Sequence, residues 1–256
     1  MTPYYAVLQY DGGGFSGWQK QATDRTVQGE FETGLERLES RRVVTHAAGR
    51  TDSGVHALGQ TVSFALGRDW AIGDLTLALR SLLPPDVWLV RLDRAPHGFN
   101  ARKHATSRRY RYAIGWDEAA FSPFRRPYEW ALQDPLDLPL LGRCATQLIG
   151  THDFRAFSAV GQTKPHYRSK IIESRWDTRG LVDGCIFTVE ADRFLHRMVR
   201  FLVGTMVEIG QGRRPFSDLE RLLTTRTNQD TSPPAPPHGL YFIGARYPQL
   251  DEGSDR

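Results

Sequence analysis

One order of secondary-structure elements occurs twice along the chain, and this repeat limits the fold more than any single motif does. In the first half, apolar residues at helical spacing predict helices over 27–39 and about 73–83. Apolar and β-branched runs predict strands around these helices, at 4–10, 43–49, 59–66 and 86–92. The resulting order is β-α-β-β-α-β, which is typical of a ferredoxin-like split β-α-β unit.

The second half repeats this order without repeating the sequence. Its predicted elements cover 107–116, 138–149, 168–177, 184–191, 195–209 and 240–247, with one additional short helix at 217–224. The helix over 195–209 has the clearest apolar stripe, which begins at Leu195 and continues to Met206. We therefore expect an α+β fold of two tandem ferredoxin-like units with mainly antiparallel sheets, divided into residues 1–100 and 101–256.

The composition of the 256 residues is that of an ordinary globular protein, with 40% hydrophobic and 24% charged residues. No apolar run approaches the ~18 residues of a membrane span, and the first residues lack the pattern of a secretory signal. The two cysteines, Cys144 and Cys185, are far apart in the sequence and lack a CxxC pattern. The sequence therefore predicts a cytoplasmic protein without a membrane span, a disulfide scaffold or a structural zinc site.

The basic residues are nearly all arginines. The chain has 33 Lys and Arg residues, a formal net charge of +4, and only four lysines. Arginine suits phosphate groups and base edges better than lysine, which favours a polyanionic partner such as RNA. A GC-rich genome explains the same ratio equally well, so the charge alone is weak support for RNA binding.

The densest polar cluster is the segment 49–56, GRTDSGVH, which lies between two predicted strands. An Asp side chain in such a segment can accept hydrogen bonds from backbone amides two residues on, so a turn is favoured by roughly three to one over a catalytic role for Asp52. A serine nucleophile at Ser53 with His56 is a weaker hypothesis, because the segment lacks the G-x-S-x-G elbow. His46 and His56 also lack the spacing of metal ligands.

Arginine and tyrosine alternate in a second cluster, at 105–112. On a strand, Arg109 and Arg111 face one side, whereas Arg108, Tyr110 and Tyr112 face the other. An aromatic ring beside cations could bind an unstacked base and its phosphates. A half-buried strand with a solvated basic face explains the pattern equally well, and both interpretations stay open here.

The segment 194–200 is a third cluster, FLHRMVR. Arg197 and Arg200 are three residues apart, so we expect both to project from a similar helix face. A solvated arginine whose stem lies along apolar surface is the simpler interpretation of Arg200. The alternative is a cation held against a carboxylate in a dry site.

The glycine-rich segment 10–19, YDGGGFSGWQ, is similar to a phosphate-binding loop only in its glycine content. It is not followed by G-K-[ST], and the next predicted helix is remote from it. We therefore do not expect a nucleotide cofactor there.

These clusters together resemble the tRNA pseudouridine synthase A family. The similar segments, in order, are YDGGGFSGWQKQ (10–21), TVQGE (26–30), GRTDSGVHA (49–57), FNAR (99–102), RRYRY (108–112), GTHDFRAF (150–157), FLHRMVR (194–200) and GLYF (239–242). The match extends from about residue 4 to residue 247, and GRTDSGVHA is its most specific part. It departs from the family pattern at Lys103-His104 and is loose over 161–167, so RNA contacts are not carried over to those residues.

The resemblance implies an enzyme that converts uridine to pseudouridine at positions 38, 39 and 40 of the tRNA anticodon stem-loop. It implies that tRNA binds in a cleft between the two halves. It also implies a homodimer in which one tRNA touches both subunits, and a reaction without a metal or other cofactor. A non-catalytic RNA-binding protein and a Ser53–His56 hydrolase are the two alternatives.

The resemblance also assigns roles to individual residues. Asp52 matches the catalytic aspartate of the family, and Arg200 matches the arginine that pairs with it. Tyr110 matches the tyrosine that packs on the target base. Arg50 matches the arginine that occupies the space left by the flipped base, and Leu240 matches an apolar residue that lines the pocket.

Overall fold

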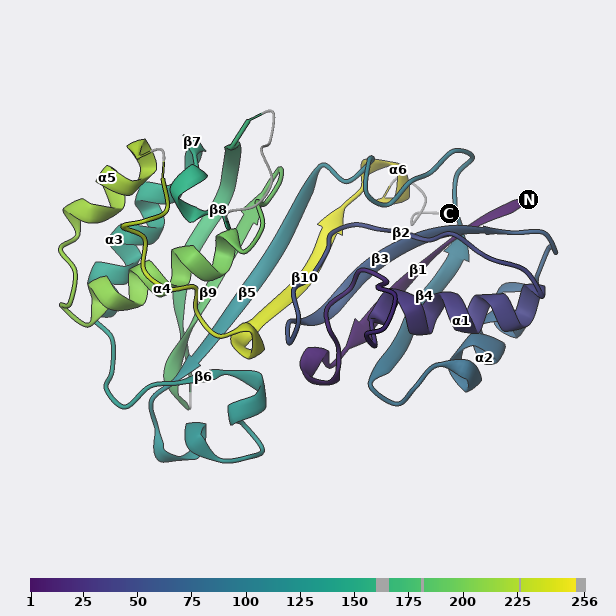
Figure 1. Ribbon diagram of the computed structural model, residues 1–256, viewed down its shortest axis with the longest axis horizontal. Helices are drawn as coiled ribbons and strands as arrows, with labels where there is room; N and C mark the ends of the chain where they lie inside the picture. The colour runs from purple at the N-terminus through teal and green to yellow at the C-terminus, as the bar shows by residue number, and fades with distance from the viewer. Residues whose placement is uncertain (160–165, 181, 226, 252–256) are drawn as a thin grey trace. The chain divides into compact units, whose positions relative to one another are not determined.

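The fold is mixed α+β, as expected. The computed structural model describes residues 1–159, 166–180, 182–225 and 227–251, so residues 161–165 of the loosely matching segment lie outside the described residues. The described chain forms ten strands, mostly antiparallel, and six α-helices (Figure 1). It divides into two compact units: unit 1 comprises Met1–Arg108 and Tyr241–Arg256, and unit 2 comprises Arg109–Leu240.

Unit 1 is a sheet with two main helices. Its elements are β1 (Thr2–Tyr10), α1 (Val27–Glu39), β2 (His46–Ala47), β3 (His56–Leu66), α2 (Ile72–Leu82), β4 (Val87–Arg94), all but the first residue of β10 (Leu240–Arg246), and α6 (Pro248–Asp251). Strand β1 lies between β4 and β3 and pairs antiparallel with both. Strand β3 also pairs antiparallel with β2, where His46 lies opposite Ser63, and parallel with β10, where Tyr241 lies opposite His56.

Local sequence signals explain the helices of unit 1. The Thr26 hydroxyl accepts a hydrogen bond from the Gly29 amide at 3.2 Å, which caps the first turn of α1. The Phe31 ring of α1 is fully buried and packs edge to face on Phe64 of β3, with ring centroids 5.6 Å apart. Helix α2 buries Leu75 and Leu79 in the same way. The amphipathic spacing therefore fixes which side of each helix covers the sheet.

Unit 2 combines five strands with three helices. Its elements are β5 (Ser107–Gly115), β6 (Trp130–Ala131), α3 (Leu138–Leu148), β7 (Gly150–Asp153), β8 (Arg168–Arg179), β9 (Val182–Ala191), α4 (Met198–Gly210) and α5 (Ser217–Thr224). The strand order is β5-β9-β8-β7, and β8 pairs antiparallel with both of its neighbours. Eleven of the 13 residues of α4 are buried, so this helix is covered on nearly all sides.

The start of α4 differs from the sequence expectation. The predicted helix begins at 195, whereas the observed helix begins at Met198, because Arg197 has a left-handed backbone with φ of 60°. Arg197 therefore precedes the helix, and the expectation that it shares a helix face with Arg200 is wrong. The strand predicted over 43–49 is reduced to the two residues of β2.

Both cysteines are buried free thiols, Cys144 on α3 and Cys185 on β9. Burial raises the pKa of Cys144 to about 11 and that of Cys185 to about 12. Because the thiolate is the reactive form, we expect neither thiol to react with iodoacetamide at pH 8 in the folded protein. Both should react after unfolding in guanidinium, which mass spectrometry of the labelled peptides measures. Rapid labelling of either thiol in the folded protein would contradict its burial.

Candidate active site

The loop 48–55 of unit 1 connects β2 to β3 and carries Asp52. Thr51 is the anchor of this loop: its hydroxyl is 2.8 Å from the Tyr10 hydroxyl, and its carbonyl accepts the Trp18 amide at 3.1 Å. Burial raises the pKa of Tyr10 to about 12, so its phenol stays protonated. On the side of β3, the Gln60 side chain donates to the Gly49 carbonyl at 2.8 Å. The first half of the loop is therefore held by the buried side chains of Tyr10 and Gln60.

A tight turn sets the backbone of Asp52. The Val55 amide donates to the Asp52 carbonyl at 3.2 Å, and Gly54 has φ of 76°, a conformation that favours glycine. Asp52 is half-buried, and Arg50 on the same loop is exposed. The loop thus presents a carboxylate and a guanidinium two residues apart on one fixed backbone.

The glycine-rich segment packs directly against this loop. A Cβ atom on Gly12 would lie 2.1 Å from the Val55 carbonyl oxygen, which is far inside contact distance. Gly17 has φ of 91°, and its Cβ would lie 2.7 Å from the Thr51 carbonyl oxygen. The two glycines therefore allow the backbone of the glycine-rich segment to approach the backbone of the loop. This close approach explains the glycines, for which the sequence alone indicated no role.

We expect Gly12→Ala to destabilise the protein by ~1–3 kcal/mol, because the new methyl group overlaps the backbone at Val55. Gly13→Ala is the matched control, since its Cβ would meet only the movable side chain of Asp11, at 3.2 Å. Thermal unfolding measures both variants. Equal melting temperatures for the two variants would show that the loop moves away from Gly12 at no cost.

Ser53 and His56 have structural contacts rather than the geometry of a nucleophile and its base. The Ser53 hydroxyl donates to the Phe15 carbonyl at 3.1 Å. The Nδ1 atom of His56 accepts the Gly12 amide at 3.0 Å, and its ring stacks on Tyr241 with centroids 4.9 Å apart. Each side chain ties the loop region to a neighbouring segment, which disfavours the hydrolase alternative.

Tyr110 of unit 2 lies on β5 and is only 7% exposed. Its ring packs edge to face on Phe194, with centroids 4.9 Å apart. Its neighbour Arg109 is bound internally: Nη2 lies 2.6 Å from Glu173 and 2.8 Å from the buried carboxylate of Glu190. Arg109 is therefore a structural ion-pair partner, whereas the ring of Tyr110 is held in one orientation.

Arg200 of unit 2 lies on α4 beside an extended segment. Residues 227–239, here called the strap, connect the region of α5 to β10. The Arg200 Nε atom donates to the Ala235 carbonyl at 2.7 Å, and the Ala235 amide donates to the Arg200 carbonyl at 2.9 Å. One strap residue thus holds both the backbone and the side chain of Arg200. Among the sequence signals, only the proline-rich SPPAPPHG marked this segment.

The end of the strap leads to Leu240, which is 5% exposed. The Tyr112 hydroxyl donates to the Pro236 carbonyl at 2.8 Å. Burial raises the pKa of Tyr112 well above 10, and the charge of Arg200 opposes this shift. A Cβ on Gly239 would lie 2.7 Å from the Tyr112 ring, so only glycine fits there. The contacts of Tyr112 with Pro236 and Gly239 therefore fix the backbone immediately before Leu240.

The five sequence-predicted site residues thus form two groups. Arg50 and Asp52 share the loop of unit 1, whereas Arg200 and Leu240 of unit 2 both adjoin the strap and Tyr110 lies on β5 of the same unit. Sequence reasoning missed Tyr10 and Ala235, which hold these groups in place. Within the described ranges, no group of three or more His, Cys, Asp and Glu side chains could hold a metal ion. Those ranges also contain no helix long and apolar enough to span a membrane.

Similarity to known proteins extends over most of the chain. A family model described as tRNA pseudouridine synthase matches residues 6–101 and 144–248. These matched segments contain Arg50, Asp52, Arg200 and Leu240, and Tyr110 lies between them.

Several curated proteins named tRNA pseudouridine synthase A are similar over nearly their whole length. That of Myxococcus xanthus is 39% identical over 238 residues, covering 91% of this chain and 88% of that protein. That of Moorella thermoacetica is 39% identical over 243 residues, covering 94% of this chain and 98% of that protein. That of Chlorobaculum tepidum is 40% identical over 241 residues, covering 94% of this chain and 96% of that protein.

Proposed function

The chain belongs to the tRNA pseudouridine synthase A family and isomerises uridine to pseudouridine in tRNA, and we propose that it acts at positions 38, 39 and 40 of the anticodon stem-loop. The choice of positions is supported by the resemblance of the segments around Asp52, Tyr110 and Arg200 to the family motifs. The observation that carries the proposed site is the fixed backbone of the loop 48–55. Tyr10 and Gln60 hold it before Asp52, and the Gly54 amide donates to the Phe15 carbonyl after Asp52.

The reaction is an internal rearrangement of one nucleotide. The N1–C1′ bond of uridine breaks, the uracil turns, and C5 forms a bond to C1′; C5 loses a proton and N1 gains one. A carboxylate can begin this sequence by adding to C6, by attacking C1′, or by promoting a glycal intermediate. We assign this step to Asp52, whose carboxylate must be ionised. Arg200 is proposed to pair with it and offset the cost of removing its charge from water.

Three further residues are proposed to bind the flipped nucleotide. Removing the target base from its stack costs a few kcal/mol. Stacking on the ring of Tyr110 recovers ~1–3 kcal/mol of that cost. Arg50, which is exposed on the same loop as Asp52, is proposed to fill the vacated space, and Leu240 is proposed to form an apolar wall of the pocket.

The remaining parts of the proposal concern the whole enzyme. We propose a cytoplasmic homodimer that binds tRNA and needs neither a metal nor a nucleotide cofactor. The tandem ferredoxin-like arrangement is supported by the order β4-β1-β3-β2 of four strands in unit 1. The second half has the elements of the same order, β5, α3, β8, β9, α4 and β10, together with the additional elements β6, β7 and α5.

The decisive experiment incubates the protein with an unmodified tRNA transcript in the presence of EDTA and maps pseudouridine at nucleotide resolution. We expect pseudouridine at positions 38, 39 and 40 wherever the transcript has uridine there. A transcript with cytidine at these positions is the control. Modification confined to uridines outside the stem-loop, or activity that requires added metal, would contradict the proposal.

A further inference from the structure

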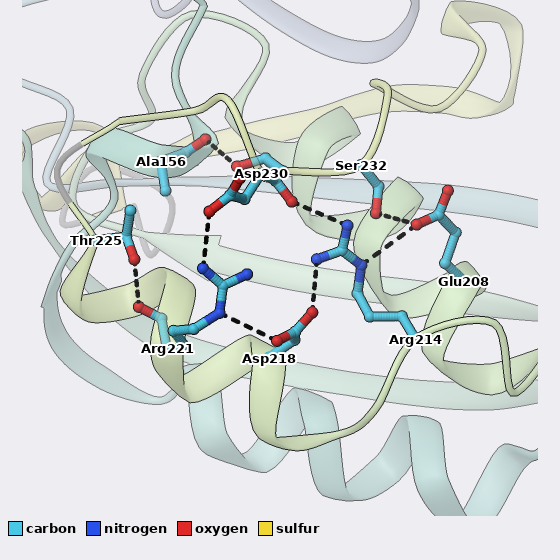
Figure 2. Close-up of polar contacts among 9 residues, drawn as sticks. Ala156, Glu208, Arg214, Asp218, Arg221, Thr225, Asp230 and Ser232 are labelled. Atoms are coloured by element: carbon cyan, nitrogen blue, oxygen red, sulfur yellow. Dashed lines mark hydrogen bonds and ion pairs between the residues drawn. The ribbon is translucent and has the colours of Figure 1, made fainter.

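A network of ion pairs fixes the strap to the helices of unit 2 (Figure 2). Arg214 is its centre, with a side chain that is 16% exposed. Its Nη1 atom contacts Asp218 Oδ2 at 2.9 Å, and its Nε atom contacts Glu208 Oε2 at 3.3 Å. Its Nη2 atom donates to the Asp230 carbonyl on the strap at 2.9 Å. One guanidinium therefore joins α4, α5 and the strap.

A second arginine closes the network. Arg221 contacts the other oxygen of Asp218 at 3.1 Å, and its Nη1 atom contacts the Asp230 carboxylate at 2.9 Å (Figure 2). On the strap, the Ser232 hydroxyl donates to Glu208 Oε2 at 2.5 Å. Single exposed ion pairs contribute little to stability, but a network with shared carboxylates and a half-buried guanidinium holds one geometry.

Three strap residues, Ser232, Pro233 and Ala235, contact α4 in turn. Ser232 bonds to Glu208, and the Ala235 peptide group bonds to Arg200, two turns earlier on the same helix. Between these contacts, a Cβ on Gly204 would lie 2.2 Å from the Pro233 carbonyl oxygen. The strap therefore runs antiparallel along the backbone of α4, from the ion-pair network at one end to Arg200 at the other.

We propose that the strap is a positioning device for Arg200 and that Arg214, through the strap, is a positioning residue for pseudouridine formation. The inference rests on the proposed function of Arg200. An arginine side chain has many rotamers, and the bond from Nε to the Ala235 carbonyl selects among them. The position of Ala235 in turn depends on the preceding strap residues Asp230 and Ser232, which the ion-pair network holds in place.

A double-mutant cycle tests this proposal with purified full-length protein and a tRNA transcript. Arg214→Gln removes the central guanidinium, and Arg200→Lys removes the Nε donor that the strap holds. We expect Arg214→Gln to slow single-turnover pseudouridine formation by about tenfold or more, because small misplacements of a reacting group are costly. Its tRNA dissociation constant should stay within about twofold of the wild-type value, because the Arg214 guanidinium is already bonded to two carboxylates and a backbone carbonyl of its own chain.

The Arg200→Lys background separates positioning from general destabilisation. Arg214→Gln should cause no further slowing there, because the strap no longer has the Nε donor to position. Arg91→Gln, which removes an exposed arginine paired with Asp93 on β4, is the matched control and should keep the wild-type rate. All rates are measured well below the melting temperature of each variant.

Two results would overturn the inference: a wild-type rate for Arg214→Gln, or equal slowing by that substitution in both backgrounds. Should Arg214→Gln fail to fold, Arg221→Gln replaces it in the same cycle, with the same expected and contrary results. A wild-type rate for Arg200→Lys alone would instead contradict the proposed function of Arg200. Wild-type activity at other uridines would contradict only the proposed positions.

Discussion

Replacing Asp52 by Asn is expected to abolish pseudouridine formation and to leave the fold and the tRNA affinity unchanged. The amide is nearly isosteric with the carboxylate, and the Val55 amide can still donate to the carbonyl of residue 52. A neutral amide is a far poorer nucleophile and cannot pair with the charge of Arg200. We expect the single-turnover rate to fall by on the order of 10³-fold or more. Melting temperature, tRNA affinity and pseudouridine yield together measure the result.

Ser53→Ala is the control for this substitution, because it alters the same turn at a residue to which no chemistry is assigned. It should lose the bond to the Phe15 carbonyl and a little stability, and keep most of the activity. The turn interpretation of Asp52 predicts that both variants are mildly affected. Substantial turnover by an Asp52→Asn preparation, verified as free of deamidation, would contradict the catalytic assignment.

Removing only the hydroxyl of Tyr110 is expected to separate tRNA binding from turnover. In Tyr110→Phe the ring remains and its packing on Phe194 is kept, so tRNA affinity should change little. If the phenol takes the C5 proton, the rate should fall by ~10²-fold or more. An ordinary phenol has a pKa near 10 and is a reluctant base, so this role requires activation by its surroundings.

Tyr4→Phe is the matched control for the loss of a phenol. The Tyr4 hydroxyl accepts the Trp70 amide at 2.9 Å, near the end of β1 opposite to Tyr10. Its loss should lower the melting temperature and leave turnover intact. Near-normal turnover by Tyr110→Phe would leave Tyr110 as a stacking platform only, and the proton would then pass to another group.

The local parts of the fold could be predicted because their signals are local. Helix α1 occupies the predicted range 27–39, since Thr26 caps its start and its apolar face has an unbroken helical period. Strands β8 and β9 are also close to their predicted ranges. The start of α4 could not be predicted, because the apolar stripe continues through Leu195 while the backbone of Arg197 is left-handed. Arginine has no preference for that conformation, so the sequence contains no sign of it.

Contacts between segments that are far apart in the sequence could not be predicted, for a different reason. The parallel pairing of β10 with β3 joins Tyr241 to His56, which are far apart in sequence, and no periodic pattern encodes it. The polar segment 49–56 could be singled out by composition, but its residues favoured a turn, and the role of Asp52 came from the family resemblance. The support that Gly12 gives to Val55 depends on contact between two backbones, which composition does not show.

The position of β10 in the chain also determines when unit 1 can finish folding during translation. Unit 1 is interrupted in the sequence: Arg108 ends its first part and Tyr241 begins the second, so unit 2 is a continuous insertion within it. At ~5–20 residues per second, a ribosome needs roughly 7 to 26 seconds to translate that insertion. The nascent first part waits this long for its last strand, with the edge of β3 next to His56 unpaired by β10. A stop codon between unit 2 and β10 would therefore remove a strand from unit 1, the unit whose larger part is translated first.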